Sequence, residues 1–512
     1  MAFLQTSLDA CVRRHPDKEA IVTRERRCSY AQLSREADLL GAALQRRGVR
    51  KGERVAILLE NSIEVAAALY GILRIGGVFI VINPQTKADK LAYLLQDSGA
   101  TALITGRSFE LVYASAVAAA SECHTLIVEG LAADADLGHC RLLSMQAVLA
   151  GSAAGIAPSG LIDYDLASLV YTSGSTGKPK GVMLSHVNMC TAADAIATYL
   201  ELRNDERILC ALPMAFDYGL YQLLLCVHVG ATLVLERSFV FPAKVLELMV
   251  QERVTVLPGI PTIYSMLLGF SALAKYDLAA LRTLTNTAAA LPKRQISDLR
   301  ATFPQARIFS MYGLTECKRV TYLPPDQLDI RPDSVGRGMP NEELWLVDES
   351  GQRLPNGATG ELVIRGSHVM RGYWRDPAAT ALRLRPGPLQ GETVLYSGDI
   401  FRTDAEGYLY FVARRDDIIK SRGQKVSPRE IEDVLYRLDG VQEAAAIGID
   451  DEVWGQAIKV FVVARSGVTL AEKHVLLHCR QHLEDYMMPK AVAIVPELPK
   501  TDTGKIRKTG LK

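Results

Sequence analysis

The first half of the chain alternates between short apolar runs and helical patterns of hydrophobic residues. Apolar runs typical of buried strands cover 53–60, 78–83, 101–105, 166–172 and 231–236. Between the first three runs, the segments 63–77 and 87–100 place apolar residues on one face of a helix. The segment 254–268 continues the pattern. This order predicts βαβ units, in which parallel strands form sheets with helices on their faces.

The pattern of apolar and polar residues changes from about Trp345. Shorter strands separated by turns are expected at 343–366 and 398–414. A charged cluster, Arg414 to Asp417, then precedes a last segment with its own strands and helices. We therefore predict an α/β protein with a large N-terminal domain over 1–413, which contains βαβ-type sheets and a small β-rich lobe. A smaller, mobile α+β domain over 414–512 is expected to follow.

Composition narrows the classes of protein that fit this pattern. The 512 residues include 58 Lys and Arg against 57 Asp and Glu, a net charge of +1, so we expect no nucleic-acid partner. The most apolar stretch, Val65 to Ile82, is interrupted by Arg74 and Gly76, and we expect no membrane span. Nine scattered cysteines without a CxxC pair, and an N-terminus without an apolar signal region, predict a cytoplasmic protein.

A loop rich in glycine and hydroxyl residues, Tyr171–Gly181, directly follows a predicted strand. Glycines let the backbone approach an anion, hydroxyl and main-chain N–H groups donate to phosphate oxygens, and Lys178 and Lys180 add positive charge. It is not a Walker A loop, because Gly174 and Gly177 are too close together. No GxGxxG occurs in the chain, so the usual dinucleotide fingerprint is missing. The loop predicts a polyphosphate cradle.

The loop resembles the signature of the adenylate-forming superfamily, which includes acyl-CoA synthetases, firefly-type luciferases and the adenylation domains of nonribosomal peptide synthesis. Further motifs follow in the family's order: Met311–Glu316 resembles its YGxTE segment and Pro499–Lys505 its terminal PxxxxGK motif. The resemblance covers nearly the whole chain. It implies these cradle residues as ligands of ATP: Thr172, Ser173, Gly174, Ser175, Thr176, Gly177, Lys178 and Lys180.

The same resemblance implies how the base and the ribose are held. Tyr312 is expected to stack on adenine. Asp399 can accept hydrogen bonds from two ribose hydroxyls because a carboxylate is acceptor-only, and Arg414 is expected to contact the ribose. The small residues around the base are Gly313, Ala288, Ala289 and Ala290.

Three residues are implied as the catalytic group: Thr315 and Glu316 at the α-phosphate and its Mg²⁺, and Lys505. An attack of a carboxylate on the α-phosphorus builds negative charge on phosphate oxygens, which a protein helps mainly by positioning groups and stabilising that charge. Mg²⁺ binds few carboxylates in addition to phosphate oxygens, and Glu316 suits that share. Asp416 falls at the family's hinge, which implies that the C-terminal domain swings between two half-reactions.

The segment around Asp217 lies at the place of the family's acyl pocket, so we expect it to bind the acid that is activated. In amino-acid-activating members an aspartate here meets the substrate's ammonium group, which would stabilise a partly buried carboxylate. Two alternatives remain open: Asp217 caps the helix that begins near Tyr218, or it meets another polar substrate group. Phe216, Tyr218, Gly259 and Thr287 are expected to line the same pocket, which suggests a small amino acid such as proline.

These observations lead to one main hypothesis and two alternatives. The main hypothesis is an AMP-forming acid–thiol ligase that activates an amino acid and transfers it to the pantetheine thiol of a stand-alone carrier protein of nonribosomal peptide synthesis. The first alternative is an acyl-CoA ligase for an acid without an amino group. The second is a catalytically silent nucleotide-binding protein, which the joint presence of Lys505, Glu316 and the glycine-rich loop disfavours.

Two further features are expected to have no catalytic role. His474, His478 and His482 recur on one face of a predicted helix, but no HExxH motif or acidic cluster completes a zinc site. Cys317 is predicted to be a small packing residue at the rim of the pocket rather than a nucleophile.

Overall fold

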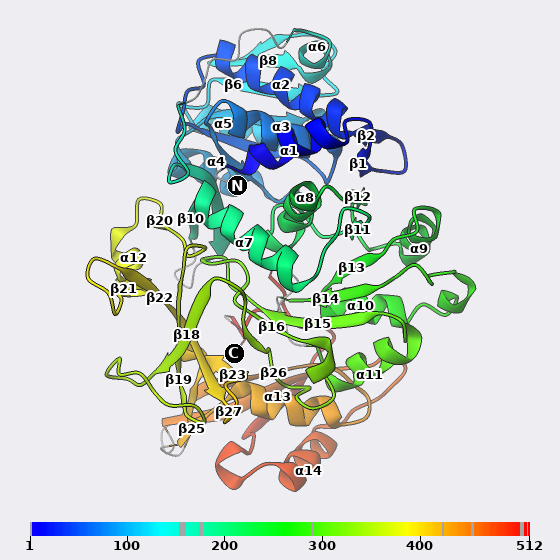
Figure 1. Cartoon of the computed structure of the whole chain (residues 1–512). Helices are drawn as coiled ribbons and strands as arrows, with labels where there is room; N and C mark the ends of the chain where they lie inside the picture. Colours follow the sequence, from blue (N-terminus) through cyan, green and yellow to red (C-terminus); the bar gives the residue numbers. More distant parts are fainter. Residues whose placement is uncertain are drawn as a thin grey trace.

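The computed structural model describes residues 3–152, 160–173, 178–287, 291–421, 424–451, 455–501, 506–508 and 510–511. Within these residues, two nine-stranded sheets and two five-stranded sheets carry the fold (Figure 1). None of the described helices is long and apolar enough to cross a membrane.

The first large sheet contains the predicted βαβ units. Its strands, in spatial order, are β20 (Gly372–Tyr373), β10 (Pro179–Ser185), β9 (Leu166–Ser173), β4 (Val78–Val81), β3 (Arg54–Leu58), β5 (Ala100–Gly106), β6 (Thr125–Glu129), β8 (Cys140–Ser144) and β7 (Ala135–Leu137). The strands from β9 to β8 are parallel, whereas β7, β10 and β20 join antiparallel to their neighbours. The prediction of parallel pairing is therefore confirmed for the centre of this sheet.

Both faces of this sheet are covered by helices. Its strands send alternate side chains, such as Ile57 and Leu58, into two different apolar clusters. The first cluster contains α2 (Tyr30–Arg46) and α3 (Ile63–Arg74), and the second contains α4 (Ala88–Ser98) and α5 (Glu110–Ala119). Burial on both faces explains why these strands are continuously hydrophobic. The helix α3 ends earlier than predicted, because Gly76 has a left-handed φ of +77° that helices do not continue.

The second large sheet is formed mainly by the middle of the chain. Its order is β17 (Arg337–Gly338), β16 (Thr321–Leu323), β15 (Arg307–Tyr312), β14 (Thr283–Asn286), β13 (Val256–Gly259), β11 (Arg207–Cys210), β12 (Thr232–Leu235), β1 (Glu19–Val22) and β2 (Arg27–Ser29). Two helices join it to the first sheet: α8 (Asp217–Val229) packs on β11 and β12, while α7 (His186–Tyr199) packs on β9, β10 and α8. One apolar core thus spans both sheets. The remaining helices of the large part are α1 (Leu4–Arg14), α6 (Met145–Leu149), α9 (Pro242–Gln251), α10 (Pro261–Leu268), α11 (Lys293–Thr302) and α12 (Pro377–Arg383).

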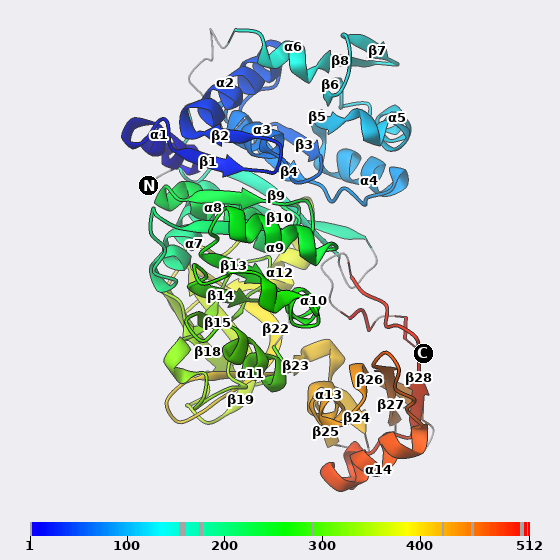
Figure 2. The ribbon, with the colours of Figure 1, turned by 90° about the vertical axis from the view of Figure 1, so that its right-hand side faces the viewer.

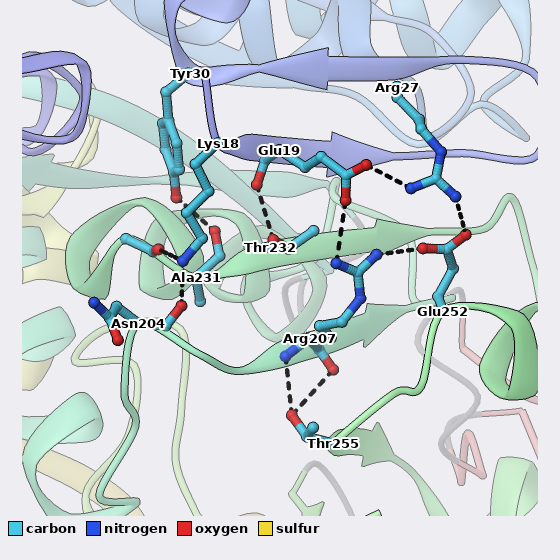
Figure 3. Close-up of polar contacts among 11 residues, drawn as sticks. Lys18, Glu19, Arg27, Tyr30, Asn204, Arg207, Ala231, Thr232, Glu252 and Thr255 are labelled. Atoms are coloured by element: carbon cyan, nitrogen blue, oxygen red, sulfur yellow. Dashed lines mark hydrogen bonds and ion pairs between the residues drawn. The ribbon is translucent and has the colours of Figure 1, made fainter. Parts of the chain in front are cut away.

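An ion-pair network fastens the N-terminal hairpin β1–β2 to the edge of the second sheet (Figure 3). Arg27 lies 2.6 Å from Glu19 and 2.5 Å from Glu252, and Arg207 lies 3.1 Å from Glu19 and also contacts Glu252. The Glu252 side chain is only 2% exposed. Because each carboxylate meets two guanidinium groups, the buried charge is compensated.

An antiparallel sheet forms the predicted β-rich lobe. It contains β18 (Glu342–Val347), β19 (Thr359–Gly366), β22 (Thr393–Thr403), β21 (Leu384–Pro386) and β23 (Leu409–Arg414). A short 3₁₀ turn at Arg415–Asp417 follows β23 directly.

The C-terminal elements have an apolar core of their own. The sheet is formed by β25 (Gln424–Val426), β24 (Ile419–Ser421), β27 (Gly455–Ala464), β26 (Val441–Asp451) and β28 (Ala491–Ile494), and it packs on α13 (Pro428–Arg437) and α14 (Glu472–His482). Ile431, Val460 and Val475 belong to that core. Figure 2 shows this α+β unit at one end of the molecule, below and to one side of the large N-terminal part.

Candidate active site

The glycine-rich loop connects two antiparallel strands, as a hairpin should. Thr172 on β9 lies opposite Lys180 on β10. The Lys180 ammonium lies 3.5 Å from Asp376 and 5.5 Å from the centre of the Tyr373 ring, while Lys178 is exposed. The turn residues Gly174, Ser175, Thr176 and Gly177 lie outside the described residues, as does the side chain of Ser173.

A second loop, between β15 and β16, carries Thr315 and Glu316. The hydroxyl of Tyr373 donates a 2.6 Å hydrogen bond to Glu316 Oε1. Burial and the neighbouring Glu316 raise the pKa of Tyr373, so its hydroxyl keeps the proton that it donates. Tyr373 belongs to β20, which pairs with β10 of the hairpin. The structure therefore joins the glycine-rich hairpin to the Thr315–Glu316 loop through one short strand.

A third group joins the end of β15 to the β-rich lobe. Asp399 on β22 accepts a 2.5 Å hydrogen bond from the hydroxyl of Tyr312, and Arg414, at the end of β23, lies 3.8 Å from the same carboxylate. Burial and Asp399 raise the pKa of Tyr312, so it acts as the donor. Gly398 has a φ of +70°, and a Cβ there would overlap the guanidinium of Arg383. Three residues that the sequence assigned to the nucleotide thus lie together.

Several predicted site residues lie beyond what the structure describes. Lys505 and the adenine-loop residues Ala288, Ala289 and Ala290 lie outside the described residues. Asp416 is described only as part of the backbone of the 3₁₀ turn after β23, and its side chain is not described. Thr287, directly before the adenine loop, is 3% exposed.

Asp217 has a partner that the sequence analysis did not consider. Its carboxylate accepts a 2.7 Å hydrogen bond from Nζ of Lys318, whose side chain is 1% exposed and also donates to the carbonyl of Thr315 at 3.1 Å. The N-cap of α8 is Phe216, and no side chain caps this helix, so the capping interpretation is wrong. The position expected for a substrate ammonium is taken by Lys318. The interpretation of Asp217 as an ammonium site for an amino acid therefore loses its physical basis, because the carboxylate is already compensated.

The backbone of Lys318 adopts a strained conformation. Its φ is +72°, in the left-handed region that side chains other than glycine rarely adopt. A Cβ on Gly313 would overlap the carbonyl oxygen of Lys318, so the loop closes on itself only with glycine at that position. Burial lowers the pKa of Lys318, and the adjacent Asp217 opposes that shift. The two hydrogen bonds of the ammonium stabilise the strained turn.

The next residue, Arg319, is 4% exposed, and its guanidinium lies 4.6 Å from the centre of the Tyr218 ring. The Tyr218 hydroxyl donates to the carbonyl of Thr285 at 2.6 Å. A Cβ on Gly259 would overlap the ring of Tyr264. The predicted pocket residues Tyr218 and Gly259 thus lie beside the end of β14.

The sequence analysis missed Lys318, Arg319 and Tyr373; the only signal available for the first two was a pair of basic residues directly after Cys317.

The structure also describes Cys317 and two of the histidines on α14. Cys317 is fully buried and belongs to the main apolar core, which confirms its packing role. The rings of His478 and His482 on α14 lie tilted to each other with centres 4.6 Å apart, and His478 Nε2 lies 3.0 Å from the carbonyl of Val434. Among the described residues, no group of three His, Cys, Asp or Glu side chains could hold a metal ion.

Sequence comparisons place the chain among known proteins. Residues 8–374 match the family described as AMP-binding enzyme, and residues 430–505 match the AMP-binding enzyme C-terminal domain. A feruloyl-CoA synthase of Amycolatopsis sp is 34% identical over 486 residues, which cover 94% of this chain and 92% of that protein. A long-chain-fatty-acid–CoA ligase of Escherichia coli O6:H1 is 31% identical over 528 residues, with 98% and 92% covered.

Solved structures agree with the sequence relatives. ATP-bound MatB from Rhodopseudomonas palustris superposes with a TM-score of 0.89 at 30% identity, covering 99% of this chain and 97% of that one. The anthranilate CoA ligase AuaEII, in complex with anthranoyl-AMP, superposes with a TM-score of 0.88 at 28% identity, covering 99% and 96%.

Proposed function

Because the chain belongs to the AMP-binding enzyme family, we propose that it is an AMP-forming ligase that joins a carboxylic acid to the thiol of CoA. The curated relatives named above are a CoA ligase and a CoA synthase. They support CoA, rather than the expected carrier protein, as the acceptor. They also favour an acid without an α-amino group, in line with the pairing of Asp217 with Lys318.

One observation carries the proposal: residues from three distant motifs converge around the end of β15. The Thr315–Glu316 loop is fastened to the glycine-rich hairpin by Tyr373, and Tyr312 is fastened to Asp399. A triphosphate held by the hairpin then has its α-phosphate at Thr315 and Glu316, with its ribose at Asp399. No single motif specifies all three contacts.

The chemistry proceeds in two steps. In the first, a carboxylate oxygen of the acid attacks the α-phosphorus of ATP, the bond to the β-phosphate breaks, and pyrophosphate leaves. In the second, the thiolate sulfur of CoA attacks the carbonyl carbon of the acyl-adenylate, and AMP leaves. Because negative charge builds on the α-phosphate oxygens in the first step, positioned donors and cations lower its barrier. Lys505 and Lys180 supply positive charge in this scheme.

Glu316 suits a magnesium ion. Its carboxylate is a hard oxygen ligand, and Tyr373 fixes its orientation through one of the two oxygens. When held by Glu316, the ion would neutralise part of the negative charge of the phosphate groups.

The domain boundary lies at 413/414 in this proposal, with Asp416 as the hinge. The supporting observations are that β23 ends at Arg414, one residue past this boundary, and that the elements beyond the 3₁₀ turn have a separate core. A rotation about this turn presents Lys505 to ATP in the first step and clears the path for CoA in the second.

Two assays test the proposed function. The exchange of labelled pyrophosphate into ATP is measured with a panel of acids: dicarboxylic, aryl, short and long aliphatic acids, and amino acids. Mass spectrometry then detects the acyl-CoA thioester. We expect acid-dependent exchange and a CoA product. Exchange without a CoA product would overturn the acceptor, and no exchange with any acid would overturn the whole proposal.

A further inference from the structure

We propose that Arg319 binds a second carboxylate of the acid and that the enzyme selects short dicarboxylic acids. This inference rests on the proposed function and specifies the substrate of the same site. The observation behind it is that the buried guanidinium of Arg319 has no acidic partner among the described residues. Arg319 is 4% exposed, and its Nε has no hydrogen-bond partner. Within the described residues its guanidinium forms no ion pair, and it lies 4.6 Å from the centre of the Tyr218 ring. Arginine is almost never fully buried unless it is paired.

The neighbours of Arg319 do not compensate its charge. Asp217, on the first turn of the helix that carries Tyr218, is bonded to Lys318 at 2.7 Å. Tyr218 remains a neutral phenol at physiological pH, because burial raises its pKa to about 12. The charged side chains at positions 217, 318 and 319 sum to one positive charge, while Glu316 on the same loop accepts a hydrogen bond from Tyr373 and is assigned to the magnesium ion in the proposed function. An anion brought by the substrate would complete the balance, whereas a substrate ammonium would add to the excess.

Arg319 lies on the loop that also carries the residues proposed to hold the α-phosphate, where the acid reacts. It belongs to the same loop as Thr315 and Glu316, which the proposed function places at the α-phosphate. Its stacking partner, Tyr218, is anchored to the carbonyl of Thr285 at the end of β14. An acid whose reacting carboxylate lies at the α-phosphate therefore has its other end beside the Arg319 guanidinium, provided that the acid is short. The planar fork of arginine fits a carboxylate with two parallel hydrogen bonds, and the tyrosine ring holds the fork in plane.

Matched acids test the assignment in the exchange assay. Succinate and glutarate are compared with butyrate and valerate, which have the same chain lengths but one carboxylate. For the full-length enzyme we expect kcat/KM for a diacid to exceed that for its matched monoacid by about 10²-fold. Arg319→Met should remove this preference and change the monoacid rate by less than about threefold. Arg319→Lys, which keeps the charge without the fork, should fall between the two.

A stability measurement separates binding from folding. Removing an uncompensated buried charge should leave the melting temperature of the free Arg319→Met variant unchanged or higher. Succinate or glutarate with AMP should raise the melting temperature of the natural enzyme and not that of the variant. Arg203→Met, at an exposed arginine on the surface, serves as the matched control and should change neither result.

Three results would overturn the assignment. In the first, the best acids of the full panel lack a second carboxylate. In the second, Arg319→Met lowers exchange with diacids and monoacids by the same factor, which would mean that Arg319 holds the reacting carboxylate. In the third, the diacid stabilises the variant as much as the natural enzyme. Each of these presupposes acid-dependent exchange, so each differs from the failure of the proposed function, in which no acid supports exchange.

Discussion

The buried pair of Asp217 and Lys318 makes a prediction that separates two interpretations of the acyl pocket. The side chains are 13% and 1% exposed, and the ammonium also donates to the carbonyl of Thr315 at 3.1 Å. Asp217→Asn keeps the size of the side chain and removes its charge. The variant leaves the Lys318 ammonium buried without a counter-ion. Breaking a buried pair in this way costs about 3–5 kcal/mol of the free energy of unfolding.

The melting temperature should fall by a measurable amount. With about 2.1 cal/mol/K of unfolding entropy per residue over roughly 400 residues, the entropy is about 0.8 kcal/mol/K, so 3–5 kcal/mol corresponds to roughly 4–6 °C. The loss should depend on pH in a defined direction. Burial lowers the pKa of Lys318 from 10.5, and Asp217 counteracts this. Without Asp217 the folded-state pKa falls further, so the unfolded chain binds more protons between the two pKa values. The deficit should therefore be largest at neutral pH and shrink as the pH rises toward 10.5.

A double-mutant cycle with thermal unfolding and pyrophosphate exchange provides the measurement. The variants are Asp217→Asn, Lys318→Met and their combination. The combination should recover much of the loss, with a coupling of about 2 kcal/mol or more. In the two variants that carry Lys318→Met, all acids should lose activity by a similar factor, because the Thr315 carbonyl loses its donor. Additive effects on stability, or a loss confined to amino acids, would refute the pairing argument and restore the substrate ammonium.

Three further predictions address the nucleotide site and the fold. Lys505→Ala should lower pyrophosphate exchange by about 10² or more while ATP still binds, and a near-normal rate would remove Lys505 from the catalytic group. Tyr312→Phe should raise the KM for ATP about tenfold by deleting the donor to Asp399, with the KM for the acid unchanged; equal changes in both would contradict a role at the ribose. Glu252→Gln should lower the free energy of unfolding by about 3 kcal/mol in urea titrations because Arg207 loses a buried counter-charge, and a loss below about 1 kcal/mol would contradict that role.

Local pattern was sufficient for the strands and helices of the first βαβ units. Strands such as 53–60 and 166–172 appear in the structure within a few residues of their expected limits, because a buried strand needs a continuous apolar run wherever it lies. The segment 254–268 was less clear, since its apolar residues suit a strand or a helix. The structure divides it into β13 and α10, and the division falls at Pro261, which can begin a helix but cannot continue a ladder.

The motifs of the candidate site could be predicted from the sequence, but the residues that contact those motifs could not. The glycine-rich hairpin, the Thr315–Glu316 loop and Asp399 could be found because each motif is contiguous and its chemistry is visible in the residue types. Tyr373, which orients Glu316, lies 57 positions further along the chain, and no local signal connects the two.

The sequence by itself determined the class of reaction, since the residues that hold a triphosphate and stabilise its charge must occur as recognisable groups. Only the tertiary structure decided the charge around Asp217. Asp217 alone suggests a negatively charged pocket that would bind the ammonium group of a substrate. Folding brings Lys318 to it from 101 positions away and leaves Arg319 beside Tyr218, which reverses the sign. The reason is physical: the effect of a buried charge depends on which charges lie within a few ångströms of it, and the order of residues along a chain does not fix that distance.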